Sequence, residues 1–210
     1  MIHKDTECGC AGALYARELS HRSANALQQA IAAVHLSRRG GAHLEEAEER
    51  LRATAALHGF LDDARHQLVD AADQVSDVCA AVVIAAGAGE TVDVLADLDP
   101  VMADKAALRP LLMIVAELVG NSVRHAFREG GGIIQVTMRH QGMVTELVIE
   151  DDGVCAGWHR RGGQGGGIVN ALVRTMGGKV GRSVTPRGSG RVEISVPSVA
   201  AITAMPAGSA

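Results

Sequence analysis

The decapeptide ELVGNSVRHA, residues 117–126, governs how the whole chain is interpreted. It lies in a longer segment where leucine and valine recur every three or four residues, the spacing of a helix with one buried face. Glu117, Asn121, Arg124 and His125 follow the same spacing, so they share one side of that helix. An acid, an amide and two basic groups beside an apolar face could gather a metal-bound triphosphate. An ordinary solvated face would contain the same residue types, so the neighbouring segments have to decide.

The sequence on both sides predicts further helices and strands. Asp104 can cap the central helix, which then extends to about Arg128, and Pro110 either bends it or begins its main part. The other predicted elements are a helix over 68–86, strands over 91–96, 133–139 and 144–150, a glycine-rich loop over 153–167, a helix over 168–176, and a hairpin of strands over 179–184 and 191–196. Because aromatic residues are scarce, the core must be aliphatic, which suits packed helices and an α/β layer.

The N-terminal part of the chain predicts an antiparallel helical hairpin. Residues 11–39 predict the first helix, and a turn at 39–42 separates it from a second helix that starts near His43. Gly59 weakens the pattern, which places a boundary between 60 and 68. Two helices alone bury too little apolar surface, so we expect two copies to pair as a four-helix bundle in a homodimer. The alternative is that the C-terminal part folds back and covers the hairpin within one chain.

His21 is the first candidate for chemistry. It lies on the first predicted helix about 120° from Leu27, at the edge of the apolar stripe. Glu18 and Asn25 are three residues before and four residues after it, so both share its face. An exposed imidazole with a carboxylate and an amide beside it is arranged for proton transfer or nucleophilic attack. Most helix-surface histidines have no such role, so this feature alone decides nothing.

A second candidate is Asp151, where a predicted strand ends in IEDDG, residues 149–153. A carboxylate there can accept a hydrogen bond from an exocyclic amine such as that of adenine. A plain Asp-Gly turn is the simpler alternative.

A third candidate is the run GQGGGI, residues 163–168, with Gly165 and Gly167 leading into a helix. Glycines let the backbone approach phosphates, and a helix start presents free N–H groups. Arg160 and Arg161 precede the run and could reach the same anion. The run is not a P-loop, because no Gly-Lys-Ser/Thr ends it.

Composition excludes several classes of function. The net charge of −4 offers no basic field for nucleic acid, and 2% aromatic residues cannot build a base-stacking platform. Cys8 and Cys10, with His3 nearby, lack the second ligand pair that a zinc site needs. The polar start predicts no signal peptide, and the longest apolar run, 78–88, is too short to cross a bilayer. We therefore expect a cytoplasmic protein with neither nucleic acid nor a membrane as a partner.

Taken in order, these segments resemble the HWE-like group of sensor histidine kinases. His-Arg-x-x-Asn at 21–25 resembles their phosphoacceptor box, and residues 117–127 resemble their asparagine box. Asp151-Asp152-Gly153 and Gly165-x-Gly167 look like their two glycine boxes, and Gly177-Gly178 also fits. The resemblance covers about residues 12–197.

The resemblance implies an α+β architecture in four parts. A helical dimerisation and histidine phosphotransfer domain, a four-helix bundle in the dimer, would span 12–66. A GHKL-type ATP-binding catalytic domain, an α/β sandwich with helices on one face of a mixed sheet, would span 67–197. Flexible segments would occupy 1–11 and 198–210.

The resemblance also implies roles. His21 would be the phosphoacceptor, Asn121 the Mg²⁺ ligand, Glu117 a polariser of bound water and Asp151 the adenine reader. Arg124 and His125 would belong to the nucleotide site, whose pocket and lid would be shaped by Gly153, Gly165 and Gly167. The expected activity is that of a cytoplasmic ATP-dependent protein histidine kinase. It would phosphorylate itself from Mg-ATP and pass the phosphoryl group to the receiver domain of a response regulator.

The chain departs from the family pattern at several positions. Arg22 follows the phosphoacceptor where many histidine kinases have an acid, and arginine cannot act as a base, so Glu18 or Asn25 must orient the imidazole. Cys155 stands where the first glycine box has its second glycine, and Ser122 where alanine is usual. No sensor domain precedes the first helix, so we expect the signal to come from a separate protein.

Two other functions stay open at this point. An ATP-independent histidine phosphotransfer adaptor with a degenerate ATP-binding domain would explain Cys155 and the missing sensor. A related ATP-domain serine kinase acting on anti-sigma partners is the other, and the hairpin with His21 argues against it.

Overall fold

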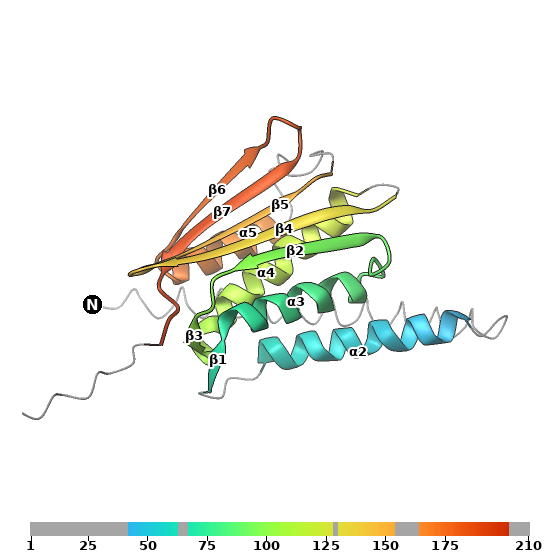
Figure 1. Cartoon of the computed structure of the whole chain (residues 1–210), viewed down its shortest axis with the longest axis horizontal. Helices are drawn as coiled ribbons and strands as arrows, with labels where there is room; N and C mark the ends of the chain where they lie inside the picture. Colours follow the sequence, from blue (N-terminus) through green and yellow to red (C-terminus); the bar gives the residue numbers. More distant parts are fainter. Residues whose placement is uncertain (1–41, 63–66, 128–129, 154–163, 202–210) are drawn as a thin grey trace, which may run out of the picture.

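The structure is a computed structural model, and it describes residues 42–62, 67–127, 130–153 and 164–201 (Figure 1). Its elements in chain order are α2 (Ala42–Asp62), β1 (Leu68–Asp70), α3 (Ala71–Ala85), β2 (Val92–Leu98), β3 (Met102–Asp104), α4 (Lys105–His125), β4 (Gly132–Gln141), β5 (Val144–Asp151), α5 (Gln164–Thr175), β6 (Lys179–Val184) and β7 (Gly190–Pro197). The first predicted helix, with Glu18, His21 and Asn25, lies outside the described residues.

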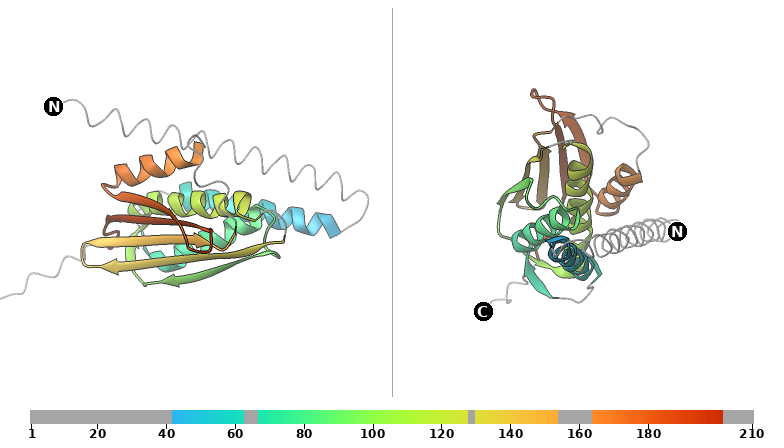
Figure 2. Two further views of the ribbon diagram at one scale, coloured as in Figure 1. Left: turned by 90° about the horizontal axis from the view of Figure 1, so that it is seen from above. Right: turned by 90° about the vertical axis from the view of Figure 1, so that its right-hand side faces the viewer.

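The main sheet has five strands in the order β2-β4-β5-β7-β6. Strand β2 runs parallel to β4, and the other neighbours are antiparallel, so the sheet is mixed as predicted. Helices α3, α4 and α5 lie on one face of this sheet (Figure 2). Layered helices on one face of a mixed sheet confirm the predicted fold class.

Strict alternation in the central strands explains why one face carries the helices. Val136, Ile149 and Val192 are cross-strand neighbours in β4, β5 and β7, and all three are fully buried. Apart from Val148, the residues next to them in each strand are polar or charged and lie on the opposite face, as expected for a sheet with one covered side.

Helix α4 is the centre of the core. Asp104 caps it, because its Oδ1 accepts hydrogen bonds from the Ala106 N–H at 2.9 Å and the Ala107 N–H at 3.3 Å. Pro110 lies inside the helix, so the helix begins before it. Among the described helices, α4 is long and apolar enough to cross a membrane, but 67% of its most apolar window is buried inside the protein. Its composition is therefore that of a core helix.

The prediction of a helix over 68–86 was wrong at its start. Residues 68–70 form β1, which pairs with β3, and the helix begins at Ala71. Both strands end in an aspartate that caps the following helix. Asp70 accepts a hydrogen bond from the Ala72 N–H at 2.9 Å at the start of α3, and Asp104 caps α4 in the same way. Strands of three residues are too short to show a period, which is why β1 and β3 escaped prediction.

Helix α2 continues through Gly59 and ends at Asp62, inside the boundary of 60–68 that the sequence predicts. Helix α5 differs from the prediction at its start: it begins at Gln164, so Gly165 and Gly167 lie in its first turn and not in a loop. Glycine is a poor helix former but does not exclude a helix.

Helix α2 packs against α3 on the outside of the helical layer (Figure 1). Ala53 is buried, and Leu57 packs against the core. A Cβ atom at Gly87, where φ is +73°, would lie 2.1 Å from the Arg50 guanidinium, so α2 sits directly over the turn after α3. Part of the second hairpin helix is thus covered within the chain, while the pairing of two copies stays a prediction.

The segment after β7 is packed as far as Ala201. Val199 is buried, and its N–H donates to the Thr145 hydroxyl at 3.2 Å. Ala200 forms an isolated antiparallel β-bridge with Ala103 of β3, and the Ala201 N–H donates a hydrogen bond to the Met102 carbonyl at 2.8 Å. We had assigned these residues to a flexible tail; they instead connect the sheet to the β1–β3 ribbon.

We predict that Val199→Ala lowers the free energy of unfolding by about 1–2 kcal/mol, because two buried methyl-sized groups are lost. Met143→Ala is the matched control, since Met143 is 81% exposed, and it should change stability by less than about 0.5 kcal/mol. Urea denaturation of the full chain measures both values. An unchanged stability for Val199→Ala would show that the segment does not contribute to the fold.

Candidate nucleotide-binding site

The candidate site lies where the C-terminal half of α4 meets the end of β5. Asp151 is the last residue of β5 and only 2% exposed. Its Oδ2 accepts a hydrogen bond of 3.0 Å from the hydroxyl of Ser122, which is fully buried on α4. The backbone N–H of Gly190 on β7 lies 3.5 Å from the Oδ1 atom. The carboxylate is therefore oriented by two neighbouring elements.

Ser122 is a site residue that sequence reasoning missed. We had noted it only as a mild departure from the alanine usual in the resembling family. In the structure it is the buried donor to Asp151, and it lies four residues after Leu118, on the apolar side of α4. A hydroxyl on an apolar helix face was the available signal, because a buried polar group needs a partner.

Gly153 holds the end of β5 against the end of α4. A Cβ atom at this position would lie 2.5 Å from the carbonyl oxygen of Ala126 and 2.7 Å from its Cβ. Only a glycine permits this close approach. By the family resemblance Gly153 would shape the nucleotide pocket, and the structure gives it a packing role at the same place.

The two aspartates of the IEDDG segment have different tasks. Asp151 faces the helices, whereas the exposed Asp152 accepts a hydrogen bond of 2.7 Å from the Ile133 N–H and so fastens β5 to β4. This division follows from strand geometry, since successive side chains point to opposite faces.

Glu117, Asn121 and Arg124 form one group on α4, as their spacing predicted. Arg124 Nη2 donates to Asn121 Oδ1 at 2.7 Å and lies 3.8 Å from Glu117 Oε1. The Glu117 side chain is only 6% exposed, against 45% for Arg124. His125 follows in the last turn and is exposed. Basic residues are favourable at a helix C-terminus in any protein, so their presence alone does not indicate a ligand.

Helix α5 contains Gly165 and Gly167, the other two residues predicted to shape the nucleotide site that the structure describes. Ile168 and Val169 anchor it to the core, and its first turn contains no acid. A Cβ atom at Gly167 would meet no atom within 4 Å, so packing does not require glycine there. Residues 154–163, with Cys155, Arg160 and Arg161, lie outside the described residues, and the predictions made for them stay untested.

The donor set on α4 fits Mg²⁺. Asn121 offers an amide oxygen and Glu117 a carboxylate, and both are hard oxygen donors of the kind that Mg²⁺ prefers. Within the described part of the chain no three His, Cys, Asp or Glu side chains form a metal cluster. Phosphate oxygens and water would therefore supply the other ligands, which is the usual arrangement for Mg²⁺.

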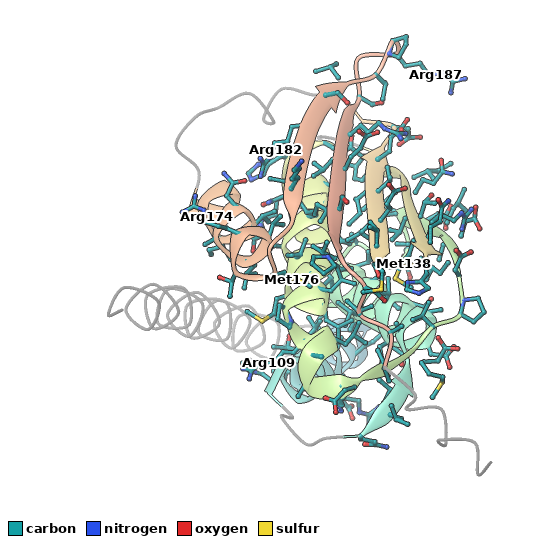
Figure 3. The ribbon with its side chains drawn as sticks, turned by 90° about the vertical axis from the view of Figure 1, so that its left-hand side faces the viewer. Arg109, Met138, Arg174, Met176, Arg182 and Arg187 are labelled. Carbon is teal, nitrogen blue, oxygen red and sulfur yellow. The ribbon has the colours of Figure 1, made fainter. Side chains whose placement is uncertain are left out.

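Arg182 is a further cation that the sequence analysis did not single out. It lies on β6 beside α5, on the side of the sheet that carries the helices (Figure 3). Partial burial lowers the pKa of its guanidinium from the ordinary value. The guanidinium is thus partly desolvated near the helix that carries the glycine run.

Arg191 and Cys79 are two further groups with polar or reactive side chains, and neither belongs to the group on α4. On the open face of the sheet Arg191 pairs with Glu193 and Glu150, at 2.8 and 2.9 Å, and hydrogen bonds to Glu193 and then Glu150 raise its pKa. Cys79 is buried in α3, and burial raises the pKa of its thiol to about 12, so it is not a thiolate nucleophile.

Comparisons with known proteins agree with this architecture. The sequence matches no protein-family model and no curated protein. Among solved structures, the histidine kinase domain from the Erythrobacter litoralis EL346 blue-light activated histidine kinase aligns with a TM-score of 0.57 at 19% identity, over 86% of this chain and 92% of that one. A bacterial phosphotransferase aligns at 0.61 with 14% identity, over 88% and 95% of the two chains. The catalytic domain of histidine kinase ThkA aligns at 0.51 with 14% identity, over 63% and 97%. The chain therefore has the fold of histidine kinase domains.

Proposed function

We propose that this chain is an ATP-dependent protein histidine kinase that phosphorylates His21. The observation that carries the proposal is the junction of α4 and β5. There a buried, oriented carboxylate, Asp151, is hydrogen-bonded to Ser122 of α4, and the same helix carries the group formed by Glu117, Asn121 and Arg124. The fold shared with histidine kinase domains supports it.

Asp151 is suited to read adenine. A carboxylate accepts hydrogen bonds and donates none when ionised, so it selects a ligand edge with an amine, such as the 6-amino group of adenine. Its orientation by Ser122 fixes the direction of that contact before the ligand arrives. A guanine would place a carbonyl oxygen against the carboxylate, which is unfavourable.

The phosphates would extend from Asp151 along the end of α4 toward the start of α5. Asn121 and Glu117 would hold Mg²⁺, which when bound neutralises charge on the phosphates. The backbone N–H groups in the first turn of α5 would meet the phosphate oxygens. Phosphoryl transfer depends mostly on such positioning and charge neutralisation.

In the transfer step a lone pair on an imidazole nitrogen of His21 attacks the γ-phosphorus. The bond from that phosphorus to the β–γ bridging oxygen breaks, and ADP leaves with the electron pair. A neutral imidazole needs little activation, and Glu18 or Asn25 would orient the ring and Glu18 could accept its proton. The labile phosphoramidate then passes its phosphoryl group to an aspartate of a partner.

The proposal extends to partners. A receiver domain of a response regulator would take the phosphoryl group, a separate sensor protein would supply the signal, and the protein would act in the cytoplasm. Pairing of the hairpins into a homodimer belongs to the same proposal. An adaptor that carries His21 but binds no ATP is the other candidate, and Cys155 is the residue that favours it.

We predict that His21→Gln abolishes phosphorylation without changing the affinity for ATP, because His21 belongs to the hairpin and not to the nucleotide site. Incubation with γ-labelled ATP, followed by acid treatment, detects a phosphoramidate by its lability. His35→Gln, on the same predicted helix, is the control and should keep the label. Acid-labile label on the His21 variant would assign the phosphoacceptor to another residue.

We predict that Asp151→Asn weakens the binding of Mg-ATP at least tenfold, about 1.4 kcal/mol, because it turns one acceptor oxygen into a donor. Ser122→Ala should weaken binding by about three- to tenfold, because the carboxylate loses one orienting hydrogen bond of about 0.5–1.5 kcal/mol. Asp152→Asn is the matched control, since the asparagine oxygen can still accept from the Ile133 N–H. Titration calorimetry measures all three. Equal losses for Asp151→Asn and Asp152→Asn would mean that the carboxylate does not read the base.

We predict that Gly167→Ala weakens Mg-ATP binding at least fivefold while the protein stays as stable as the wild type or becomes up to about 1 kcal/mol more stable. A Cβ meets no protein atom there and improves the helix, but it would intrude where phosphates approach the backbone. Thermal unfolding and calorimetry separate the two effects. Unchanged affinity would show that the start of α5 does not contact the nucleotide.

A further inference from the structure

In the structure, the guanidinium of Arg124 contacts both residues whose oxygen atoms would bind the proposed metal, Asn121 and Glu117. Its Nη2 atom donates to Asn121 Oδ1 at 2.7 Å and lies 3.8 Å from Glu117 Oε1. The three residues come from successive turns of α4, so one guanidinium spans both oxygens. The favourable position of a cation at a helix C-terminus explains a positive charge here. It does not explain why the guanidinium is aimed at a neutral amide oxygen.

Glu117 gives this contact its physical reason. Its side chain is 94% buried within the fold, and a buried carboxylate is costly unless a positive or hydrogen-bonding partner is near. Arg124 supplies such a charge from the surface, where its own side chain is 45% exposed. A protein that keeps an acid ready for a divalent cation needs another cation beside it in the absence of that metal.

The two cations compete for the same oxygens. Mg²⁺ binds oxygen at about 2.0–2.1 Å in a nearly ideal octahedron, which leaves little room for a guanidinium beside the same two groups. Two positive charges at this separation also repel each other, most strongly where water is excluded. We therefore expect Arg124 to move away from at least one of the two oxygens when a metal arrives. Its exposed, unbranched side chain can rotate without disturbing the core.

We propose that Arg124 is the resident counter-ion of this site: it balances Glu117 and holds the Asn121 amide in the free protein, and it gives way to Mg²⁺ when the nucleotide binds. The proposal rests on the proposed function, because it assumes that Mg²⁺ enters with a nucleotide. Arg124 is thus a positioning residue that sets how strongly nucleotide binding depends on the metal.

The test compares metal dependence in matched variants. Calorimetry of the full chain gives the dissociation constant for ADP in excess MgCl₂ and in EDTA, and the ratio of the two constants measures the contribution of the metal. In Arg124→Gln the metal no longer has to displace the Arg124 guanidinium, so the ratio should rise at least fivefold over the wild type. Arg174 is an exposed arginine in the last turn of α5 and serves as the control. Arg174→Gln should leave the ratio within twofold of the wild type.

A second measurement tests the counter-ion role without nucleotide. In EDTA, Arg124→Gln should lower the thermal midpoint of the wild-type protein, and the same change should have little effect in a Glu117→Gln background. Arg124→Lys keeps a positive charge and should retain most of the wild-type midpoint. A similar loss in both backgrounds would mean that Arg124 does not compensate Glu117.

The outcomes separate this inference from the proposed function. A wild-type protein that binds no ADP with MgCl₂ overturns the proposed function and the exchange of cations with it. A wild-type protein that binds ADP with magnesium, together with an unchanged or reduced ratio in Arg124→Gln, overturns the exchange alone. In that case Arg124 contacts phosphates or has only a structural role.

Discussion

The hydrogen bond from Ser122 to Asp151 connects the central helix to the central strand, and the geometry of the candidate site depends on it. Both groups are buried, so each needs the other to avoid an unsatisfied polar atom in the core. This requirement favours one rotation of α4 relative to β5. Asn121 and Arg124 lie on the same C-terminal part of α4 as Ser122.

Close backbone contact makes this junction possible. Gly153 approaches the last carbonyl of α4, and a Cβ at Gly132 would lie 2.2 Å from the Phe127 ring and 2.6 Å from Asp152 Oδ1. Small residues at both strand ends thus bring the end of the helix to the edge of the sheet. A nucleotide at that edge would meet the side chains of α4 and the carboxylate of β5 together.

Charge is distributed unevenly over the two faces of the protein. On the open face of the sheet, acids and arginines pair across strands, as Arg139 does with Asp97 and Arg191 with Glu150, and exposed pairs of this kind contribute little to stability. On the helical side, Glu117 and Asp151 are buried and depend on named partners. A buried acid beside a partly exposed arginine, as in the pair of Glu117 and Arg124, distinguishes this site from the ion pairs on the open face.

The sequence by itself determined the order of the longer helices and strands and the grouping of Glu117, Asn121 and Arg124, because helical and strand periods are local properties of the chain. The mixed sheet was implied only by the resemblance to histidine kinases. The sequence also placed Asp151 at a strand end.

Only the tertiary structure decided that Ser122 faces Asp151, since that pair is 29 residues apart and depends on how α4 rotates on the sheet. The same holds for the β1–β3 ribbon and for the packed segment 198–201. Both are stabilised by contacts between distant segments, and local propensity carries no information about such contacts.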